Sequence, residues 1–195
     1  MNTDIILKNI NSKVTLSDQE TEFLKSVVIA RPFKPGELIV RAGDPARYLM
    51  FVNSGYLMTY FTDTDGKDHV VQFATNGWWA PDLYSLSKEP NTPYSTRGLC
   101  DGELLLIPRL SLDQMFRVCA NMDRYFRIQF QNTVIRHQGR ILKRHTAPAE
   151  ERYQEFIDAY PRMEQYVAQK YIASYLGITP EFLSKVRSKM ARKIS

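Results

Sequence analysis

The chain has 195 residues, of which 44% are apolar and 24% are charged. A chain of this length and composition buries a core without disulfides or structural metals, and it is neither disordered nor collagen-like. The net charge of +5 is uneven, because residues 1–120 carry 12 basic and 14 acidic side chains, whereas residues 121–195 carry 14 and 7.

The first half of the chain predicts one helix followed by β structure. Residues 15–29 read as a helix, since a capping-box pattern begins at Ser17 and apolar residues recur at helical spacing. Over residues 33–107, short apolar runs are interrupted by turn residues about every ten positions, which is typical of an antiparallel sandwich or barrel. Asp65-Gly66 predicts a tight hairpin, and Asp101-Gly102 predicts a second.

A long helix is predicted over about residues 117–144, and its length would be about 42 Å. Two apolar stripes run along it and need two partners. We expect one to cover the β structure of the same chain and the other to meet a second copy in a homodimer; the alternative is a helix sandwiched inside a monomer. The heptad stripe assigned to the dimer contains Tyr125, Ile128, Asn132, Ile135, Gly139 and Leu142. The other stripe contains Met122, Phe126, Phe130, Val134, His137 and Ile141.

Residues 169–189 have the layout of a helix-turn-helix. Ala173 is small where two helices would cross, and Gly177 suits the positive φ of the turn. Thr179 is a good N-cap, and Pro180 suits the first position of the second helix. The shared core is expected to contain Ile172, Leu176, Ile178, Leu183 and Val186.

The basic second helix predicts contact with DNA, although a solvated terminal helix would show the same charges. Glu181, Ser184 and Lys185 lie near its start, where side chains reach base edges. Phe182 either touches a thymine methyl group or packs. The full predicted contact set is Gln169, Lys170, Thr179, Glu181, Phe182, Ser184, Lys185, Arg187, Ser188, Lys189, Arg192 and Lys193. Within it, Gln169, Lys170, Arg187, Lys189, Arg192 and Lys193 are expected to hold phosphates.

This order of elements resembles the Crp/Fnr family of bacterial transcription regulators over nearly the whole chain. Residues 35–44 and 48–55 look like the opening strands of that family's sensor domain. Residues 149–156 look like its usual entry into the DNA-binding domain. The resemblance implies an α+β fold with an antiparallel, jelly-roll-like β-roll of the cyclic-nucleotide-binding type, a long dimerisation helix and a C-terminal helix-turn-helix.

The domain boundaries follow from the same elements. We expect a β-roll sensor domain with the N-terminal helix over residues 1–116, the dimerisation helix over 117–146 and the DNA-binding domain over 147–195. The family usually adds a β-hairpin wing after the recognition helix. Since the chain stops at Ser195, we expect the helix-turn-helix to lack an evident wing.

The expected effector pocket departs from the family pattern. Members that bind cyclic AMP hold the ribose with Gly-Glu-Leu and the phosphate with an arginine about ten residues later. Here the corresponding run is Pro81-Asp82-Leu83, and no arginine follows before Arg97, which makes cyclic AMP a doubtful effector. The surrounding aromatic and hydroxyl groups suit a flat or apolar ligand, or they fill the pocket themselves. The candidate pocket residues are Trp78, Trp79, Asp82, Leu83, Tyr84, Thr92, Tyr94 and Ser95.

No catalytic set, phosphate-binding glycine loop or metal cluster occurs at a usable spacing, so we expect neither an enzyme nor a cofactor. Cys100 and Cys119 are isolated, and no apolar run or leader predicts a membrane span or secretion, which favours a cytoplasmic protein. The expected partners are double-stranded DNA, a second copy of the chain, RNA polymerase and a small-molecule effector. The alternative is a ligand- or protein-binding module that no longer recognises DNA.

Overall fold

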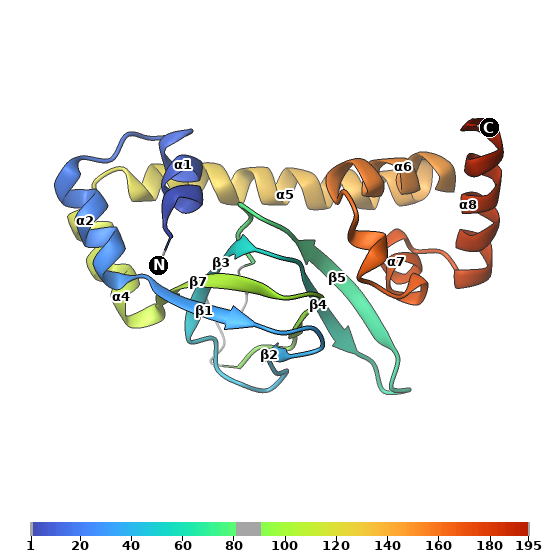
Figure 1. The fold of residues 1–195 in the computed structure, drawn as a ribbon, viewed down its shortest axis with the longest axis horizontal. Coiled ribbons are helices and arrows are strands. Elements are labelled where there is room, and N and C mark those ends of the chain that lie inside the picture. Colours follow the sequence, from blue (N-terminus) through green and yellow to red (C-terminus); the bar gives the residue numbers. More distant parts are fainter. Residues whose placement is uncertain (1, 81–90, 195) are drawn as a thin grey trace.

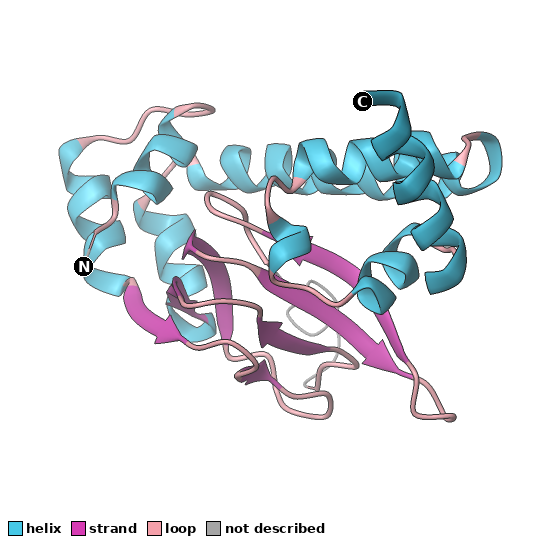
Figure 2. Cartoon of the chain, turned by 45° about the vertical axis from the view of Figure 1, so that its right-hand side comes forward, coloured by secondary structure: helices cyan, strands magenta, loops and turns pink. Residues whose placement is uncertain are grey.

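A computed structural model describes residues 2–80 and 91–194, with side chains described up to residue 192. A β-roll forms the middle of the molecule, and one long helix, α5, crosses above its strands (Figures 1 and 2). Three helices, α1, α2 and α4, gather at one end of α5. The helices α6, α7 and α8 gather at its other end (Figure 1).

Two antiparallel sheets build the β-roll, as predicted. The first has the order β1-β7-β3, and the second has the order β2-β6-β4-β5. The side chains between them include Phe33, Leu57 and Leu104, each at most 2% exposed. The strands are β1 Ile29–Phe33, β2 Leu38–Val40, β3 Tyr48–Ser54, β4 Leu57–Thr62, β5 Asp68–Ala74, β6 Ser95–Gly98 and β7 Gly102–Pro108.

The two predicted hairpins have different outcomes. Asp65-Gly66 does join two paired strands, β4 and β5, and Gly66 has a φ of +77°. The Asp101-Gly102 hairpin is wrong, because β6 and β7 belong to different sheets and this segment carries the chain from one sheet to the other. Gly102 is required there by packing, since a Cβ atom would lie 2.3 Å from the Phe33 ring.

The N-terminal region contains two helices where the sequence pattern predicted one. In α2, Asp18–Val27, the Ser17 hydroxyl accepts a hydrogen bond from the Glu20 amide and the Glu20 carboxylate accepts one from the Ser17 amide, so the capping box is confirmed. The additional helix is α1, Asp4–Asn11. Its signal in the sequence is the pair Ile6 and Ile10, one turn apart and both fully buried.

The long predicted helix is divided. Its first residues end α4, Arg109–Val118, and α5 begins only at Met122 and runs to Thr146. Cys119 is buried between the two helices with a non-helical backbone, and this break allows α4 to pack on α2. The 25 residues of α5 span about 37 Å.

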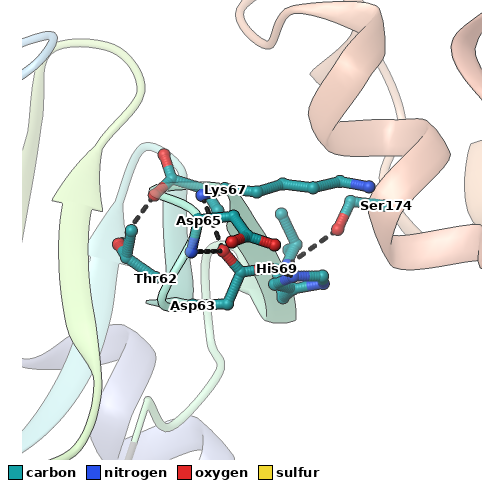
Figure 3. A network of polar contacts seen from close by, with 8 residues as sticks. Thr62, Asp63, Asp65, Lys67, His69 and Ser174 are labelled. Carbon is teal, nitrogen blue, oxygen red and sulfur yellow. Dashed lines mark hydrogen bonds and ion pairs between the residues drawn. The ribbon is translucent and has the colours of Figure 1, made fainter.

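The C-terminal helices dock on the free edge of β5. They are α6, Ala149–Ala159, the short 3-10 helix η1, Met163–Gln165, α7, Gln169–Leu176, and α8, Pro180–Ile194. Figure 3 shows Ser174 of α7 close to His69 of β5. The Val70 amide donates to the Ser174 hydroxyl at 3.0 Å, and the Tyr160 hydroxyl donates to the Phe73 carbonyl. These bonds satisfy backbone groups that an edge strand would otherwise leave open.

The same docking is supported by an apolar cluster shared between the β-roll and the C-terminal helices. Phe73 is fully buried, and its ring centre lies 5.2 Å from that of Tyr175 and 5.7 Å from that of Phe156. Tyr171 adds a polar contact, since its hydroxyl donates to the Asp68 carboxylate. The position of α7, and of α8 after it, is therefore tied to the sheet.

Candidate nucleic-acid interface and effector cavity

The turn between α7 and α8 forms as the sequence predicted. Gly177 has a φ of +70°, and the Ile178 amide donates to the Ala173 carbonyl, which closes α7 with a left-handed glycine cap. The Thr179 hydroxyl accepts a hydrogen bond from the Phe182 amide at 3.2 Å, and Pro180 is the first residue of α8. The predicted core is buried at Ile172, Leu176, Leu183 and Val186 and half-buried at Ile178.

One face of α8 is exposed. Glu181, Ser184, Lys185, Ser188 and Arg192 are all exposed, and their spacing places them on one side of the helix. The opposite side is buried. Hydrogen bonds with its own backbone amide, and then with the Thr179 hydroxyl, lower the pKa of Glu181, so this residue presents an ionised acceptor. Phe182 is 47% exposed and does not fill the core.

Two of the predicted phosphate contacts are engaged within the protein. Arg187 Nε lies 3.4 Å from Glu164 Oε1, and Lys189 Nζ lies 2.7 Å from Glu150 Oε1. Gln169 and Lys170 are exposed at the start of α7, and Thr179 is exposed at the start of α8 while it caps that helix. The side chain of Lys193 lies outside the described residues.

The described members of the predicted effector set do not line one common cavity, since Trp78 and Trp79 line a cavity that Thr92, Tyr94 and Ser95 do not. Trp79 faces α5, where its Nε1 donates to the Tyr125 hydroxyl at 2.6 Å. The Arg136 guanidinium lies over the Trp78 ring, with its central carbon 4.3 Å from the centre of that ring. These tryptophans were predicted beside Asp82, Leu83 and Tyr84, which lie outside the described residues.

The remaining predicted effector residues stabilise a turn elsewhere in the β-roll. The Ser95 hydroxyl accepts a hydrogen bond from the Ala42 amide, and the Thr92 hydroxyl accepts one from the Tyr94 amide. Thr92 is only 2% exposed. These contacts give the three residues a structural role at the edge of the second sheet.

A cavity of about 450 Å³ lies between α5 and the β-roll. Trp78 and Trp79 line it, together with Arg136, His137 and Arg140 of α5, and the described lining contains no carboxylate. Burial, then the nearby Arg140 and Arg136, lowers the pKa of His137, so its imidazole is neutral near pH 7. The sequence pattern did not single out Arg136 and Arg140, because neither belongs to the stripe that was assigned to the sheet.

The structure corrects the predicted dimer stripe. Tyr125 is fully buried within its own chain, where its hydroxyl donates to Asn9, so it cannot lie on an outer surface. Ile135 and Leu142 are 65% and 62% exposed, as a stripe facing away from the sheet requires. Of the other three, Ile128 is half-buried, Asn132 is exposed and Gly139 lines a cavity.

Two residues assigned to the inward stripe also face outward. Val134 and Ile141 are 50% and 58% exposed. Together with Ile135 and Leu142 they form two apolar pairs spaced by one heptad, which we call the exposed α5 face. The helix therefore carries an uncovered apolar surface, rotated from the predicted one.

Among the residues that the structure describes, no group of three or more His, Cys, Asp or Glu side chains could hold a metal ion. Burial raises the pKa of both thiols, Cys100 and Cys119. No helix in the described part of the chain is long and apolar enough to cross a membrane.

Comparisons with known proteins find similarity to a cyclic nucleotide-binding domain and to regulatory proteins. A family model of the cyclic nucleotide-binding domain matches residues 30–118. The chain is 24% identical to the anaerobic regulatory protein of Pasteurella multocida (strain Pm70), over 91% of this chain and 69% of the relative. It is 25% identical to the transcriptional activator protein Anr of Pseudomonas aeruginosa, over 89% of this chain and 75% of the relative.

Solved structures share the fold. FixK2 from Bradyrhizobium japonicum matches with a TM-score of 0.73 and 20% identity, over 86% of both chains. The c-di-GMP-responsive regulator CLP of Xanthomonas campestris matches with a TM-score of 0.69 and 16% identity, over 91% of this chain and 93% of the other. With 86% and 91% of this chain covered, both alignments extend beyond the β-roll.

Proposed function

Because the chain belongs to the Crp/Fnr family of transcription regulators, we propose that it binds double-stranded DNA as a homodimer and regulates transcription in the cytoplasm rather than catalysing a reaction. The observation that carries the proposal is the exposed polar face of α8, which has two cations and one carboxylate, on a helix-turn-helix whose turn and N-cap are formed. Lys185 and Arg192 are exposed cations on this face. Such a helix is the element that this motif inserts into the major groove.

The contacts divide into base recognition and phosphate binding. Glu181 accepts from a cytosine amine, Lys185 donates to guanine, and Ser184 adapts to either. Arg192, Gln169 and Lys170 hold phosphates and set affinity. Arg187 and Lys189 contribute less than the sequence suggested, because Glu164 and Glu150 compete with phosphate for them.

The dimer forms through the exposed α5 face. Its four apolar side chains, Val134, Ile135, Ile141 and Leu142, are between 50% and 65% exposed in the single chain. Pairing two such helices would bury them and hold two copies of α8 about 34 Å apart, the spacing of successive major grooves. An inverted repeat is the matching operator.

A small-molecule effector would occupy the cavity between α5 and the β-roll. The effector could shift the equilibrium between two arrangements of α5 and the C-terminal helices only by the difference in its affinity for them. Cyclic AMP is not the proposed effector, since Arg97 follows too late in the sequence and its guanidinium donates to the Tyr60 hydroxyl. RNA polymerase is a further proposed partner, as a regulator of this kind acts on transcription through it.

The test is fluorescence anisotropy of labelled duplexes over a range of salt concentrations. Affinity should fall steeply with salt, and Arg192→Ala should reduce the slope by about one phosphate. Lys185→Ala should reduce discrimination between sequences, whereas the matched control Arg124→Ala, an exposed cation on α5, should change neither property. If neither α8 variant changes its measured property, the alternative of a sensor module that no longer recognises DNA is favoured.

A further inference from the structure

A second cavity, of about 280 Å³, lies where α5, α6 and α7 meet. Its lining includes Arg144 near the end of the long helix and Leu176 at the end of α7, so the cavity lies at the joint between that helix and the helix-turn-helix. Trp78, Arg136 and Arg140 line both this cavity and the one between α5 and the β-roll, so the two are neighbours. We call this second cavity the joint cavity. Among the cavities described, Gly139 lines the joint cavity alone.

Four guanidinium groups line the joint cavity. Arg136, Arg140 and Arg144 follow one another at four-residue spacing along one side of α5, and Arg152 faces them from α6. The described lining includes one carboxylate, that of Glu155, and it is already paired with Lys143. The four arginines therefore have no carboxylate of their own in this lining.

Backbone carbonyl oxygens compensate these charges only in part. Arg144 donates to the Ser174 and Tyr175 carbonyls at 3.3 and 3.1 Å, and Arg152 donates to the Leu176 carbonyl at 2.5 Å. These are the last carbonyls of α7. They carry the negative end of its dipole, which amounts to about half an elementary charge.

Arg144 and Arg152 are compensated incompletely, whereas Arg140 also donates to the Val71 carbonyl at 2.7 Å. Burial, then Arg140 and Arg152, lowers the pKa of Arg144. Among the described residues, the buried Nε of Arg152 has no hydrogen-bond partner. An unpaired buried donor among like charges is destabilising, and a bound anion would relieve both effects.

The walls of the cavity are aromatic. The rings of Trp78 and Tyr160 have centres 5.3 Å apart, and Tyr160 and Tyr175 approach within 6.0 Å. Arg136 already stacks on the Trp78 ring at 4.3 Å, and Arg140 stacks on the Tyr175 ring at 4.5 Å. A planar ligand would share these rings with the guanidinium groups, and the volume is just below the usual range for small-molecule sites. Charge and shape together select a ring that carries a negative group.

We propose that the joint cavity binds a small aromatic oxyanion, a single ring bearing a carboxylate or a phosphate, with the oxyanion held by Arg152 and Arg144 and the ring against Trp78 and Tyr175. This site lies beyond the proposed DNA interface and does not depend on it. Since Arg144 and Arg152 also hold the end of α7, an occupant would act on the helix that directly precedes α8.

The test is isothermal titration calorimetry of the full chain with four probes. Benzoate and phenyl phosphate carry the proposed ring and charge, benzamide is a neutral ring, and inorganic phosphate lacks the ring. Benzoate or phenyl phosphate should bind at least about tenfold more tightly than benzamide and than inorganic phosphate. If benzoate alone binds, the natural ligand is a carboxylate, and if phenyl phosphate alone binds, it is a phosphate ester.

Two variants and a control locate the site. Arg152→Gln should weaken binding by about tenfold or more, the effect of one charge-assisted hydrogen bond. Arg136→Gln is a second variant that should also weaken binding, because Arg136 contacts the Trp78 ring. It leaves the end of α7 in place, because Arg136 holds none of the α7 carbonyls. Arg124→Gln removes the same charge from an exposed position of α5 and should leave binding unchanged.

The proposal is overturned if neither ring-bearing anion binds at millimolar concentration, or if benzamide binds as tightly as benzoate. It is also overturned if Arg124→Gln weakens binding as much as Arg152→Gln and Arg136→Gln do. Because calorimetry is performed without DNA, each of these results leaves the DNA-binding proposal to its own test.

Discussion

Replacing Ile135 with aspartate tests the exposed α5 face. In the single chain Ile135 is 65% exposed, so Ile135→Asp should change the stability of the folded monomer by no more than about 0.5 kcal/mol. In the proposed dimer that exposed area is buried in both copies. Full burial of an isoleucine contributes about 1.5–3 kcal/mol, so two copies buried to this extent contribute about 2–4 kcal/mol.

This loss corresponds to a dissociation constant raised by about 30-fold to 1000-fold. The buried carboxylates add to it by mutual repulsion. Sedimentation equilibrium measures the dissociation constant, and circular dichroism shows whether the monomer remains folded. The matched control is Leu110→Asp, at a side chain of α4 that is 95% exposed and outside the exposed α5 face, and it should leave the dimer intact. A variant at Ile135 with an unchanged dissociation constant would refute the assigned interface.

Three further substitutions test the local structure. Thr179→Ala should destabilise the protein by about 1 kcal/mol, because the Phe182 amide loses its acceptor; an unchanged melting temperature would argue against this cap. Gly139→Ala should stabilise α5 by about 0.5–1 kcal/mol, since nothing lies within 4 Å of the added carbon. A lower melting temperature of this variant would mean that another surface approaches Gly139. Since burial and two arginines lower the pKa of His137 in the folded chain, its contribution to stability is present above the unfolded pKa of about 6.5 and is lost as the pH falls. The melting temperature of His137→Gln should therefore fall less on acidification than that of the unchanged chain, and identical pH profiles would contradict this.

Local signals in the sequence were sufficient where the responsible contacts are local. The Ser17 capping box, the Asp65-Gly66 hairpin, the Gly177 turn and the Thr179 cap each involve residues a few positions apart. Their hydrogen bonds or φ angles are those that the residue types favour. The regular spacing of turns indicated an antiparallel sandwich or barrel in the same way, and the family resemblance specified the β-roll.

Contacts between distant segments explain the errors. Asp101-Gly102 has the composition of a hairpin turn, but whether the flanking strands pair depends on the two sheets they join. The heptad spacing that included Tyr125 could not show that Asn9 and Trp79 bind its hydroxyl. The break after α4 contains neither glycine nor proline, so nothing in the local pattern marked Cys119 as the end of a helix.

The arginine-lined joint cavity was not foreseen for the same reason. Arg136, Arg140 and Arg144 were visible in the sequence as charges on a long helix. Their proximity to Arg152 arises only because the C-terminal helices dock on β5 and fold back beside α5. Docking of this kind depends on packing between segments that are about 100 residues apart.

The most direct test of the central claim is selection of binding sites from a random duplex library by the purified protein at two salt concentrations. A dimer that presents two copies of α8 should enrich an inverted repeat with half-sites one helical turn, about 34 Å, apart, with weaker retention at the higher salt concentration. No enrichment at either concentration would contradict sequence recognition by this helix, and a sensor module acting through other partners would take its place.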